Sequence, residues 1–526
     1  MKIAASDLPR SLQSEEDGRI ELEKIARGNR QKTLLQLALL AVITAVYLTH
    51  LSTGHVFIND DFAAYVMHAA NLVEGRPYTA INYVPNPKAP WTAPANGYPP
   101  VYPLLLAPVY KVWGLNLLAM KVVTVGCFVV FLANFDELTR SVFSPLMRAC
   151  AILILAFNPV FWEHRDYLLS EFPYLMFSFA SLLVIQRVYR DLAADEYRIG
   201  KALLLSLLLY CSYGARTIGI VLLPAVMLAD LIRFRRPSRF VIVVFVFTAV
   251  LIIGQTLFFT SPTGYVSAVH FSPRMTVGNA IFYAKTLSYV WQNGFSKKIQ
   301  IIFALFFTSL AAVGCARILK SKSSASEFYL AGYLLILFAW SAEIGLRGLL
   351  PILPLYFAYG LQEFGRIAES LGRPIRMLAV SLLALFTTVT YAGQIRSLSR
   401  QLPEPNVQDA TARELFSFLR TNTQPGEVLI FSKPRTLALF TSRRVASLAP
   451  AELPEDSYQF MKSVNACILV EARWSPPSWG SFLEDRKADT LELFHNSDYR
   501  VFRIKWDENS PASAGLKALH SDLRCP

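Results

Sequence analysis

Long apolar segments separated by short polar ones run along most of the chain. About eleven of these segments are apolar enough to cross a membrane, although several are shorter than the roughly 20 residues of a straight span. They comprise residues 34–51, 117–135, 149–161, 172–188, 202–213, 218–232, 240–259, 299–316, 328–344, 349–361 and 377–391. Hydrophobic residues make up 53% of the chain and charged residues only 17%, whereas a soluble domain carries about 25% charged residues. The pattern therefore predicts a polytopic α-helical membrane protein.

Lysine and arginine gather in every second loop between the apolar segments. The cation-rich stretches are residues 24–32, 187–201, 233–239, 317–322 and 366–376. Cytoplasmic loops of membrane proteins carry such an excess, so the net charge of +13 indicates topology and not a nucleic-acid partner. The positive-inside rule places the N-terminus, with a tail of residues 1–33, in the cytoplasm. An odd number of spans then puts the C-terminus outside.

Two of the loops predicted to be external, residues 52–116 and 260–298, are too long to be simple turns. The first of them is rich in Pro, Tyr and Trp. Its short apolar stretch 101–113 predicts a helix that lies at the membrane interface and does not span it. With these loops included, the predicted membrane domain covers residues 34–395.

Beyond the last predicted span, charged and turn residues return and the apolar runs shorten to the length of strands. Residues 412–419 follow a helical pattern, and residues 428–431, 466–470 and 499–504 have the character of strands. These features predict a small extracytoplasmic α/β domain over residues 404–507, followed by a tail of residues 508–526. The six cysteines show no CxxC or paired spacing, so the sequence predicts neither a disulfide framework nor a zinc site.

Two adjacent carboxylates, Asp60 and Asp61, follow the first predicted span closely. A carboxylate at the membrane surface suits a general base or a metal ligand. The structural alternative is a helix N-cap, with Asn59 or Asp60 capping a helix that starts at Phe62. Adjacent residues point in different directions, so only one of the two carboxylates is expected to face a shared substrate. From spacing alone both interpretations stay open.

The residues around this acidic pair resemble a known family. The run Asp60-Asp61-Phe62-Ala63-Ala64-Tyr65, followed by Gly75-Arg76-Pro77-Tyr78 and by Tyr98-Pro99-Pro100, is similar to the first external loop of the GT-C glycosyltransferases. This superfamily includes the protein O-mannosyltransferases and the bacterial lipid A aminoarabinose transferases. Asp61 stands where the family more often has Glu.

Further segments match the family in the same order along the chain. They are Ser170-Glu171, Arg216-Thr217-Ile218-Gly219 and Arg347-Gly348-Leu349-Leu350-Pro351. In the tail, residues 418–423 and 437–444 resemble the external domains of bacterial members. Each motif is short, but the shared order over nearly the whole chain makes the resemblance specific. It implies a GT-C-like membrane domain.

The resemblance also implies a reaction. A hexose or pentose would move, with inversion, from a polyprenyl-phosphate donor to an acceptor hydroxyl on the extracytoplasmic face of a bacterial inner membrane. The acceptor would be a glycan, a glycolipid or a protein. By its position in the motif, Asp60 is the expected general base.

The lipid phosphate that leaves in this reaction needs positive charge nearby. Arginine grips phosphate oxygens two at a time. The candidates for this role are Arg216, Arg347, Lys297 and Lys298. No cofactor other than the lipid-linked donor is required, and a divalent metal ion held by Asp60, Asp61 or His164 stays open.

Glu171 is expected to orient the acceptor or to complete a site with Asp60, and an ion pair with Arg165 is the alternative. Tyr65 of the acidic motif, together with His164, Arg165 and Asp166, forms the set of candidates on the acceptor side. Glu343 precedes Arg347 by four residues, which favours an ion pair along one helix.

Two other classes of function fit parts of the sequence. A transporter or flippase of a lipid-linked sugar would use the same arginines without a base. A scaffold protein would bind cell-wall polymer with its external domain. The sequence has no internal repeat of the kind that builds secondary transporters. Convergence of Asp60, Glu171 and Arg216 on one external site would favour the transferase.

Overall fold

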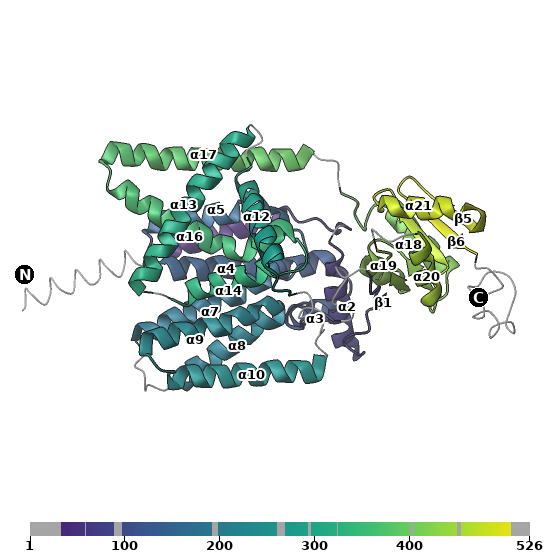
Figure 1. The fold of residues 1–526 in the computed structure, drawn as a ribbon, viewed down its shortest axis with the longest axis horizontal. Coiled ribbons are helices and arrows are strands. Elements are labelled where there is room, and N and C mark those ends of the chain that lie inside the picture. Colours follow the sequence, from purple (N-terminus) through teal and green to yellow (C-terminus); the bar gives the residue numbers. More distant parts are fainter. Residues whose placement is uncertain are drawn as a thin grey trace, which may run out of the picture.

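The computed structural model describes residues 33–57, 59–88, 97–191, 198–259, 269–292, 296–322, 324–400, 404–449 and 454–505. These residues form a large bundle of helices and, at one end of it, a mixed β-sheet flanked by helices (Figure 1). Segments from the first long loop lie between the two parts, so this loop connects them in space as well as in sequence (Figure 1).

Within the described residues, six helices are long and apolar enough to cross a membrane. They are α4 (Leu117–Thr139), α7 (Glu171–Asp191), η3 (Thr217–Val221) continued by α9 (Leu222–Phe234), α10 (Arg239–Phe259), α13 (Lys297–Lys322) and α17 (Arg373–Arg400). Four shorter apolar helices accompany them: Thr33–Thr49, α5 (Pro145–Ala156), α8 (Ile199–Ala215) and α14 (Ala325–Phe338). The chain is therefore a multi-pass membrane protein, while the number of eleven spans stays a prediction.

Helices α10 and α17 lie on opposite outer sides of the bundle (Figure 1). Their apolar side chains are largely exposed, and Phe258 near the end of α10 is 81% exposed. Exposed apolar surface of this extent marks a surface that contacts lipid or a partner. On long apolar helices at the outside of a bundle, lipid is the expected neighbour.

Helices α13 and α16 (Leu353–Glu369) pack closely because Gly314 of α13 has no side chain. A Cβ added at Gly314 would lie 2.5 Å from the backbone oxygen of Tyr359 in α16. Gly314→Ala should therefore lower the free energy of unfolding by about 1–3 kcal/mol. Gly126→Ala is the matched control, since nothing lies within 4 Å of a Cβ at that position of α4. Thermal unfolding in detergent measures both variants, and identical melting temperatures would contradict the close packing.

Shorter helices cover the end of the bundle that faces the sheet and complete its interior. They are α2 (Asp61–Glu74), α3 (Val101–Trp113), α6 (Pro159–His164), α12 (Pro273–Ser288), η4 (Tyr289–Trp291), α15 (Gly345–Leu349) and η5 (Leu350–Ile352). Helix α2 is buried on nearly all sides. Helix α3, predicted as an interfacial helix, leaves Leu104, Val112 and Trp113 exposed.

The sheet has six strands in the order β1-β3-β2-β4-β6-β5. The strands are β1 (Tyr83–Val84), β2 (Val428–Ile430), β3 (Arg444–Ala446), β4 (Ile468–Ala472), β5 (Thr490–His495) and β6 (Tyr499–Ile504). Strands β1 to β4 pair in parallel, and β6 pairs with β4 and β5 in antiparallel fashion. The flanking helices are α18 (Ala410–Asn422), α19 (Pro434–Thr441), α20 (Pro454–Ser463), α21 (Pro477–Asp485) and η6 (Lys487–Asp489).

Strand β1 comes from the first long loop, whereas the other five strands come from the C-terminal part of the chain. One hydrophobic core also includes residues of both parts, such as Phe62 and Tyr102 from the loop and Phe431 and Val445 from the sheet. Because backbone pairing and apolar burial both join them, the sheet is fixed on the end of the membrane bundle.

Cysteine chemistry differs from the expectation of no disulfide. Cys467, buried at the start of the β4 region, is disulfide-bonded. Cys127, Cys150, Cys211 and Cys315 are free. The expectation was wrong because disulfide pairing depends on distance in the fold, which the spacing of cysteines along a chain does not reveal.

Candidate functional site

Four charged residues from distant parts of the chain meet at the end of the bundle that faces the sheet. Nη1 of Arg347 donates a hydrogen bond of 2.7 Å to Oδ2 of Asp61. Nε of Arg347 and Nη1 of Arg216 both donate to Oε1 of Glu171. We call Asp61, Glu171, Arg216 and Arg347 the charge cluster. The structure thus brings together four of the residues that the sequence motifs singled out.

The elements that carry the charge cluster explain its geometry. Asp61 and Glu171 are the first residues of α2 and α7, where a negative charge interacts favourably with the helix dipole. Arg216 follows the end of α8 in an extended conformation, and Gly219 lies within η3, which begins directly after Arg216. A Cβ at Gly219 would lie 2.6 Å from the backbone of Ser212. The Arg-x-x-Gly motif therefore holds Arg216 where two helices approach closely.

The side chains of the two arginines of the cluster are more exposed to solvent than that of the glutamate between them. Glu171 is fully buried, whereas the side chains of Arg216 and Arg347 are 18% and 26% exposed. A buried carboxylate needs paired positive charge, and two guanidinium groups supply it here. Both arginine side chains are therefore more accessible than the carboxylate that joins them.

Asp60 lies beside the cluster but makes different contacts. Its Oδ1 accepts hydrogen bonds from the backbone N–H of Thr436 at 2.7 Å and from the Thr436 hydroxyl at 2.8 Å. Its Oδ2 accepts one from the backbone N–H of Arg435 at 3.1 Å. These donors begin α19, and the side chain of Asp60 makes no capping bond to α2. Asp60 therefore caps a helix from the other end of the chain and not its own helix.

Arg435 is a site residue that the sequence motifs did not reveal. It is buried, and its Nη1 lies 3.7 Å from Oδ2 of Asp60 and 3.6 Å from Oδ1 of Asp61. Its guanidinium carbon lies 4.7 Å from the ring centre of Tyr83 and 5.5 Å from that of Tyr98. The one available signal was its place after strand β2, because side chains beyond the carboxyl ends of parallel strands often form sites.

The two neighbouring aspartates titrate in opposite directions. Burial raises the pKa of Asp60, and the opposing effects of Arg435 and Thr436 do not cancel this rise. For Asp61, burial acts in the same sense, but the guanidinium groups of Arg347 and Arg435 hold its pKa well below the usual range. A pair of carboxyl groups with separated pKa values is typical of sites that use them in different roles.

The segment before Glu171 contributes one residue to the neighbourhood of the cluster. Nδ1 of His164 donates to the backbone oxygen of Val160 at 2.8 Å. Burial lowers the pKa of His164, although the nearby charge of Glu171 opposes this shift. Tyr65 donates to the Ser170 hydroxyl at 2.9 Å, directly beside Glu171. His164 and Tyr65 therefore both lie next to the charge cluster.

Arg165 and Asp166 point elsewhere. The guanidinium of Arg165 stacks on Trp162 at 4.0 Å and donates to the backbone oxygen of His50 at 3.2 Å. The alternative of a Glu171–Arg165 ion pair is therefore wrong, since Glu171 pairs with the two arginines of the cluster. Asp166 forms an ion pair of 2.8 Å with Lys121.

Three further predictions from the sequence concern lysines and a glutamate. Lys297 and Lys298 are exposed in the first turn of α13. In the part of the chain that the structure describes, no hydrogen bond or ion pair joins them to the charge cluster. The predicted pair of Glu343 with Arg347 is also not formed there, because α15 begins only at Gly345 and Glu343 lies outside the helix.

A metal ion has no ready set of ligands here. Among the described residues, no three His, Cys, Asp or Glu side chains are grouped so that they could hold one. The oxygens of Asp60 and Asp61 instead face Arg347, Arg435 and Thr436. This donor set suits carboxylates held by cations and does not fit a metal site.

Two buried histidines hold the loop that carries the acidic pair. Nδ1 of His55 donates to the backbone oxygen of Val56, and its Nε2 accepts from the backbone N–H of Leu168 at 3.1 Å. His68 likewise bridges Tyr78 and Tyr98. Both rings are therefore neutral. Burial lowers the pKa of His55 to about 3 and that of His68 to about 4.

These histidines predict acid sensitivity. Above the ordinary pKa of 6.5 their contribution to stability is fully present, and it is lost as the pH falls toward 4 and 3, because only the unfolded chain binds the proton. The melting temperature should therefore drop between pH 6.5 and pH 4. In the double variant His55→Gln, His68→Gln the drop should be shallower, since Gln offers a donor and an acceptor but does not titrate. Parallel curves for both proteins would contradict this role.

The sequence and the structure of the chain were compared with those of known proteins. No family model and no curated protein sequence matches the chain. ArnT from Cupriavidus metallidurans, in a crystal structure bound to undecaprenyl phosphate, superposes with a TM-score of 0.59 at 12% identity. The match covers 89% of this chain and 98% of that chain.

The archaeal oligosaccharyltransferase AglB from Archaeoglobus fulgidus, in complex with an inhibitory peptide and a dolichol-phosphate, has a TM-score of 0.56 at 12% identity, covering 84% of this chain and 70% of that chain. An AglB structure with Zn and sulfate has a TM-score of 0.56 at 10% identity, covering 82% and 68%. ArnT and AglB both belong to the GT-C superfamily. The chain therefore has the GT-C fold, as its sequence motifs predicted.

Proposed function

We propose that the protein is a glycosyltransferase that moves a sugar from a polyprenyl-phosphate donor to an acceptor hydroxyl on the extracytoplasmic face of a bacterial inner membrane. The observation that carries this proposal is the charge cluster beside Asp60. It combines two partly exposed arginines with a carboxylate of raised pKa at the end of the membrane bundle. Solved structures of the same fold are bound to undecaprenyl phosphate or a dolichol-phosphate.

Arg216 and Arg347 are the proposed ligands of the lipid phosphate. A guanidinium group grips phosphate oxygens through two parallel hydrogen bonds. Both arginines are held by Glu171, and Arg347 is also held by Asp61. A bound phosphate would take over part of these contacts at little cost, because the arginines are already in place. Lys297 and Lys298 remain proposed as outer contacts of the phosphate.

Asp60 is the proposed general base. The acceptor oxygen attacks the anomeric carbon while the bond from that carbon to the phosphate oxygen breaks, and Asp60 takes the hydroxyl proton. Three fixed hydrogen bonds orient its carboxylate, and burial raises its pKa, which makes it the better proton acceptor of the acidic pair. A single displacement of this kind inverts the anomeric centre.

The remaining candidates divide by their surroundings. Tyr65 and His164 lie beside Glu171 and are proposed to line the acceptor side of the site. Asp61 and Glu171 set the positions of the arginines. In this proposal the positive charge at the leaving phosphate comes from Arg216 and Arg347. The acceptor is a glycan, a glycolipid or a protein.

Two features support the proposed orientation of the protein in the membrane. The cation-rich loops favour a cytoplasmic N-terminus. Disulfides persist in oxidising compartments, so the disulfide at Cys467 supports an extracytoplasmic location for the sheet and its helices. The site lies between this sheet and the bundle, so it would open toward the extracytoplasmic side.

A deletion strain tests the proposed function. Mass spectrometry of envelope glycans, glycolipids and proteins from a strain without this gene should show the loss of one sugar, because the transferase that adds it is missing. Membranes of that strain should regain the sugar when the purified protein is added. A flippase would give another result: lipid-linked sugar would cross a reconstituted bilayer unchanged, with no release of free polyprenyl phosphate.

A further inference from the structure

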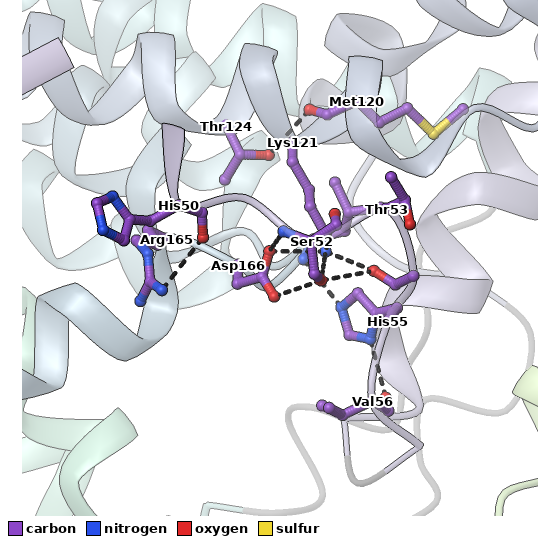
Figure 2. Close-up of polar contacts among 12 residues, drawn as sticks. His50, Ser52, Thr53, His55, Val56, Met120, Lys121, Thr124, Arg165 and Asp166 are labelled. Atoms are coloured by element: carbon purple, nitrogen blue, oxygen red, sulfur yellow. Dashed lines mark hydrogen bonds and ion pairs between the residues drawn. The ribbon is translucent and has the colours of Figure 1, made fainter. Parts of the chain in front are cut away.

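A fully buried lysine contacts two segments that precede the acidic residues of the site. Lys121 of α4 is 0% exposed. Its ammonium donates to Oδ1 of Asp166 at 2.8 Å, to the Ser52 hydroxyl at 2.9 Å, to the Ser52 backbone oxygen at 3.0 Å and to the Gly54 backbone oxygen. Figure 2 shows these contacts converging on one point between three segments of chain.

The same network is closed on its other side. The backbone N–H of Ser52 donates to Oδ1 of Asp166 at 2.9 Å, and the Ser52 hydroxyl donates to Oδ2 at 2.6 Å (Figure 2). Oδ1 of Asp166 therefore accepts from two groups and Oδ2 from one, while the ammonium of Lys121 has four acceptors within hydrogen-bond distance. An ion pair of this kind persists in a protein only with such additional hydrogen bonds.

The segments held by Lys121 are those that lead to the acidic residues of the site. Gly54 precedes Asp60 by six residues, and Asp166 precedes Glu171 by five. His55 adds a bond between the same two segments through the backbone N–H of Leu168. Since five or six residues reach at most about 20 Å, the anchor points limit where the acidic residues at the ends of these connections can lie.

We propose that Lys121 is a positioning residue, which clamps both acidic segments to α4 and so sets the spacing between the Asp60-Asp61 pair and Glu171. This role rests on the proposed transferase function. A buried ion pair contributes little net stability compared with apolar residues of similar volume, so stability alone gives no reason for a charged group at this position. Directional hydrogen bonds from a charged group are, however, well suited to hold two loops in one fixed position relative to each other.

A matched control lies on the same helix. Asp136, near the opposite end of α4, forms an ion pair of 3.1 Å with Arg148, and the side chains are 11% and 6% exposed. This pair is buried in a similar way but lies at the far end of the helix, because Asp136 follows Lys121 by 15 positions in α4, about 22 Å along the helix axis. Arg148→Met therefore breaks a buried pair without touching the anchors of the acidic segments.

The experiment compares Lys121→Met, Asp166→Asn and Arg148→Met in the full-length protein. Transfer is measured with the lipid extract of the deletion strain as donor source, and donor-site binding with undecaprenyl phosphate as probe. Lys121→Met should lower turnover by more than about tenfold, since small misplacements of reacting groups cost about this much or more. Affinity for undecaprenyl phosphate should change far less. Asp166→Asn, which keeps the shape of the network, should give a smaller loss of the same kind.

Hydrogen exchange supplies a readout that does not depend on turnover. In Lys121→Met, residues 50–57 and 164–171 should exchange faster than in the wild type, while α19 should be unchanged. Arg148→Met should keep the turnover of the wild type, and its hydrogen exchange in both segments should stay as slow as in the wild type. Equal losses of turnover for Lys121→Met and Arg148→Met, or unchanged exchange in Lys121→Met, would overturn the positioning role. A wild-type protein that neither binds undecaprenyl phosphate nor transfers sugar would instead overturn the proposed function, and the exchange experiment would still test the clamp.

Discussion

Replacing Asp60 by Asn should lower sugar transfer by about 10²–10⁴-fold while the protein stays folded. Asn retains a side-chain oxygen that accepts from the Thr436 backbone and hydroxyl, and it is a good capping residue for the helix that begins there. The substitution removes the ability to take a proton, and it also replaces the oxygen that accepts from the backbone N–H of Arg435 by a donor group. Turnover of purified protein in nanodiscs, with its melting temperature, separates these two effects.

Asp61→Asn is the matched control for this substitution. Asp61 is ion-paired with Arg347, and its pKa is held low by Arg347 and Arg435 against the effect of burial, so it is a weak proton acceptor. Its loss should weaken donor binding, because Arg347 loses a partner that orients it, and should affect turnover at saturating donor less than Asp60→Asn. A larger loss of turnover in Asp61→Asn would exchange the roles of the two residues. Wild-type turnover in Asp60→Asn would exclude Asp60 as the general base.

Arg347→Gln should weaken binding of undecaprenyl phosphate by about 10- to 100-fold, the effect of about 1.5–3 kcal/mol for a hydrogen bond to a charged group. The same substitution should lower stability, because Asp61 and Glu171 both lose a partner. The double variant Asp61→Asn, Arg347→Gln should recover part of the stability but none of the affinity. This comparison separates the loss of a phosphate ligand from the loss of a structural ion pair.

Arg366→Gln is the control for charge alone. Arg366 lies in the last turn of α16, where its side chain is 55% exposed and pairs with the buried Glu363 at 3.3 Å. Its replacement removes the same charge and should leave the affinity for undecaprenyl phosphate unchanged. Isothermal titration or native mass spectrometry in detergent measures all three variants. Wild-type affinity in Arg347→Gln would exclude this arginine from the phosphate site.

The long membrane helices follow directly from the sequence. The predicted spans 117–135, 172–188 and 240–259 fall on α4, α7 and α10, because an unbroken apolar run can satisfy its backbone in lipid only as a helix. The short apolar stretches are less determined. Residues 349–361, predicted as one span, comprise the end of α15, the 3-10 turn η5 and the first half of α16, since Pro351 and Pro354 interrupt the regular helix there.

The sheet was only partly predictable. Residues predicted as strands, 428–431 and 499–504, coincide with β2 and β6, where apolar side chains lie in short runs between turns. Strand β1 in the first loop could not be predicted from the sequence, because it has only two residues and pairs with β3, more than 350 positions away. Local periodicity contains no information on such a pairing.

The site shows the same division. Asp60, Glu171, Arg216 and Arg347 could be selected from the sequence because each lies in a short segment that resembles a GT-C motif. Their partners could not be predicted, because Glu171 joins Arg216 and Arg347 only after helices from three regions have packed. Arg435 was missed for the same reason: its contact with the acidic pair depends on α19 docking onto Asp60.

A structure of the protein with undecaprenyl phosphate bound would test the central claim most directly. The account predicts a phosphate oxygen within hydrogen-bond distance of Arg216 or Arg347, on the side of the cluster that faces Asp60. A hollow of about 310 Å³ lies at the opposite end of α4 and α7, and its lining includes Arg140, Arg187 and Arg190. A phosphate bound there, with the charge cluster unchanged, would contradict the account.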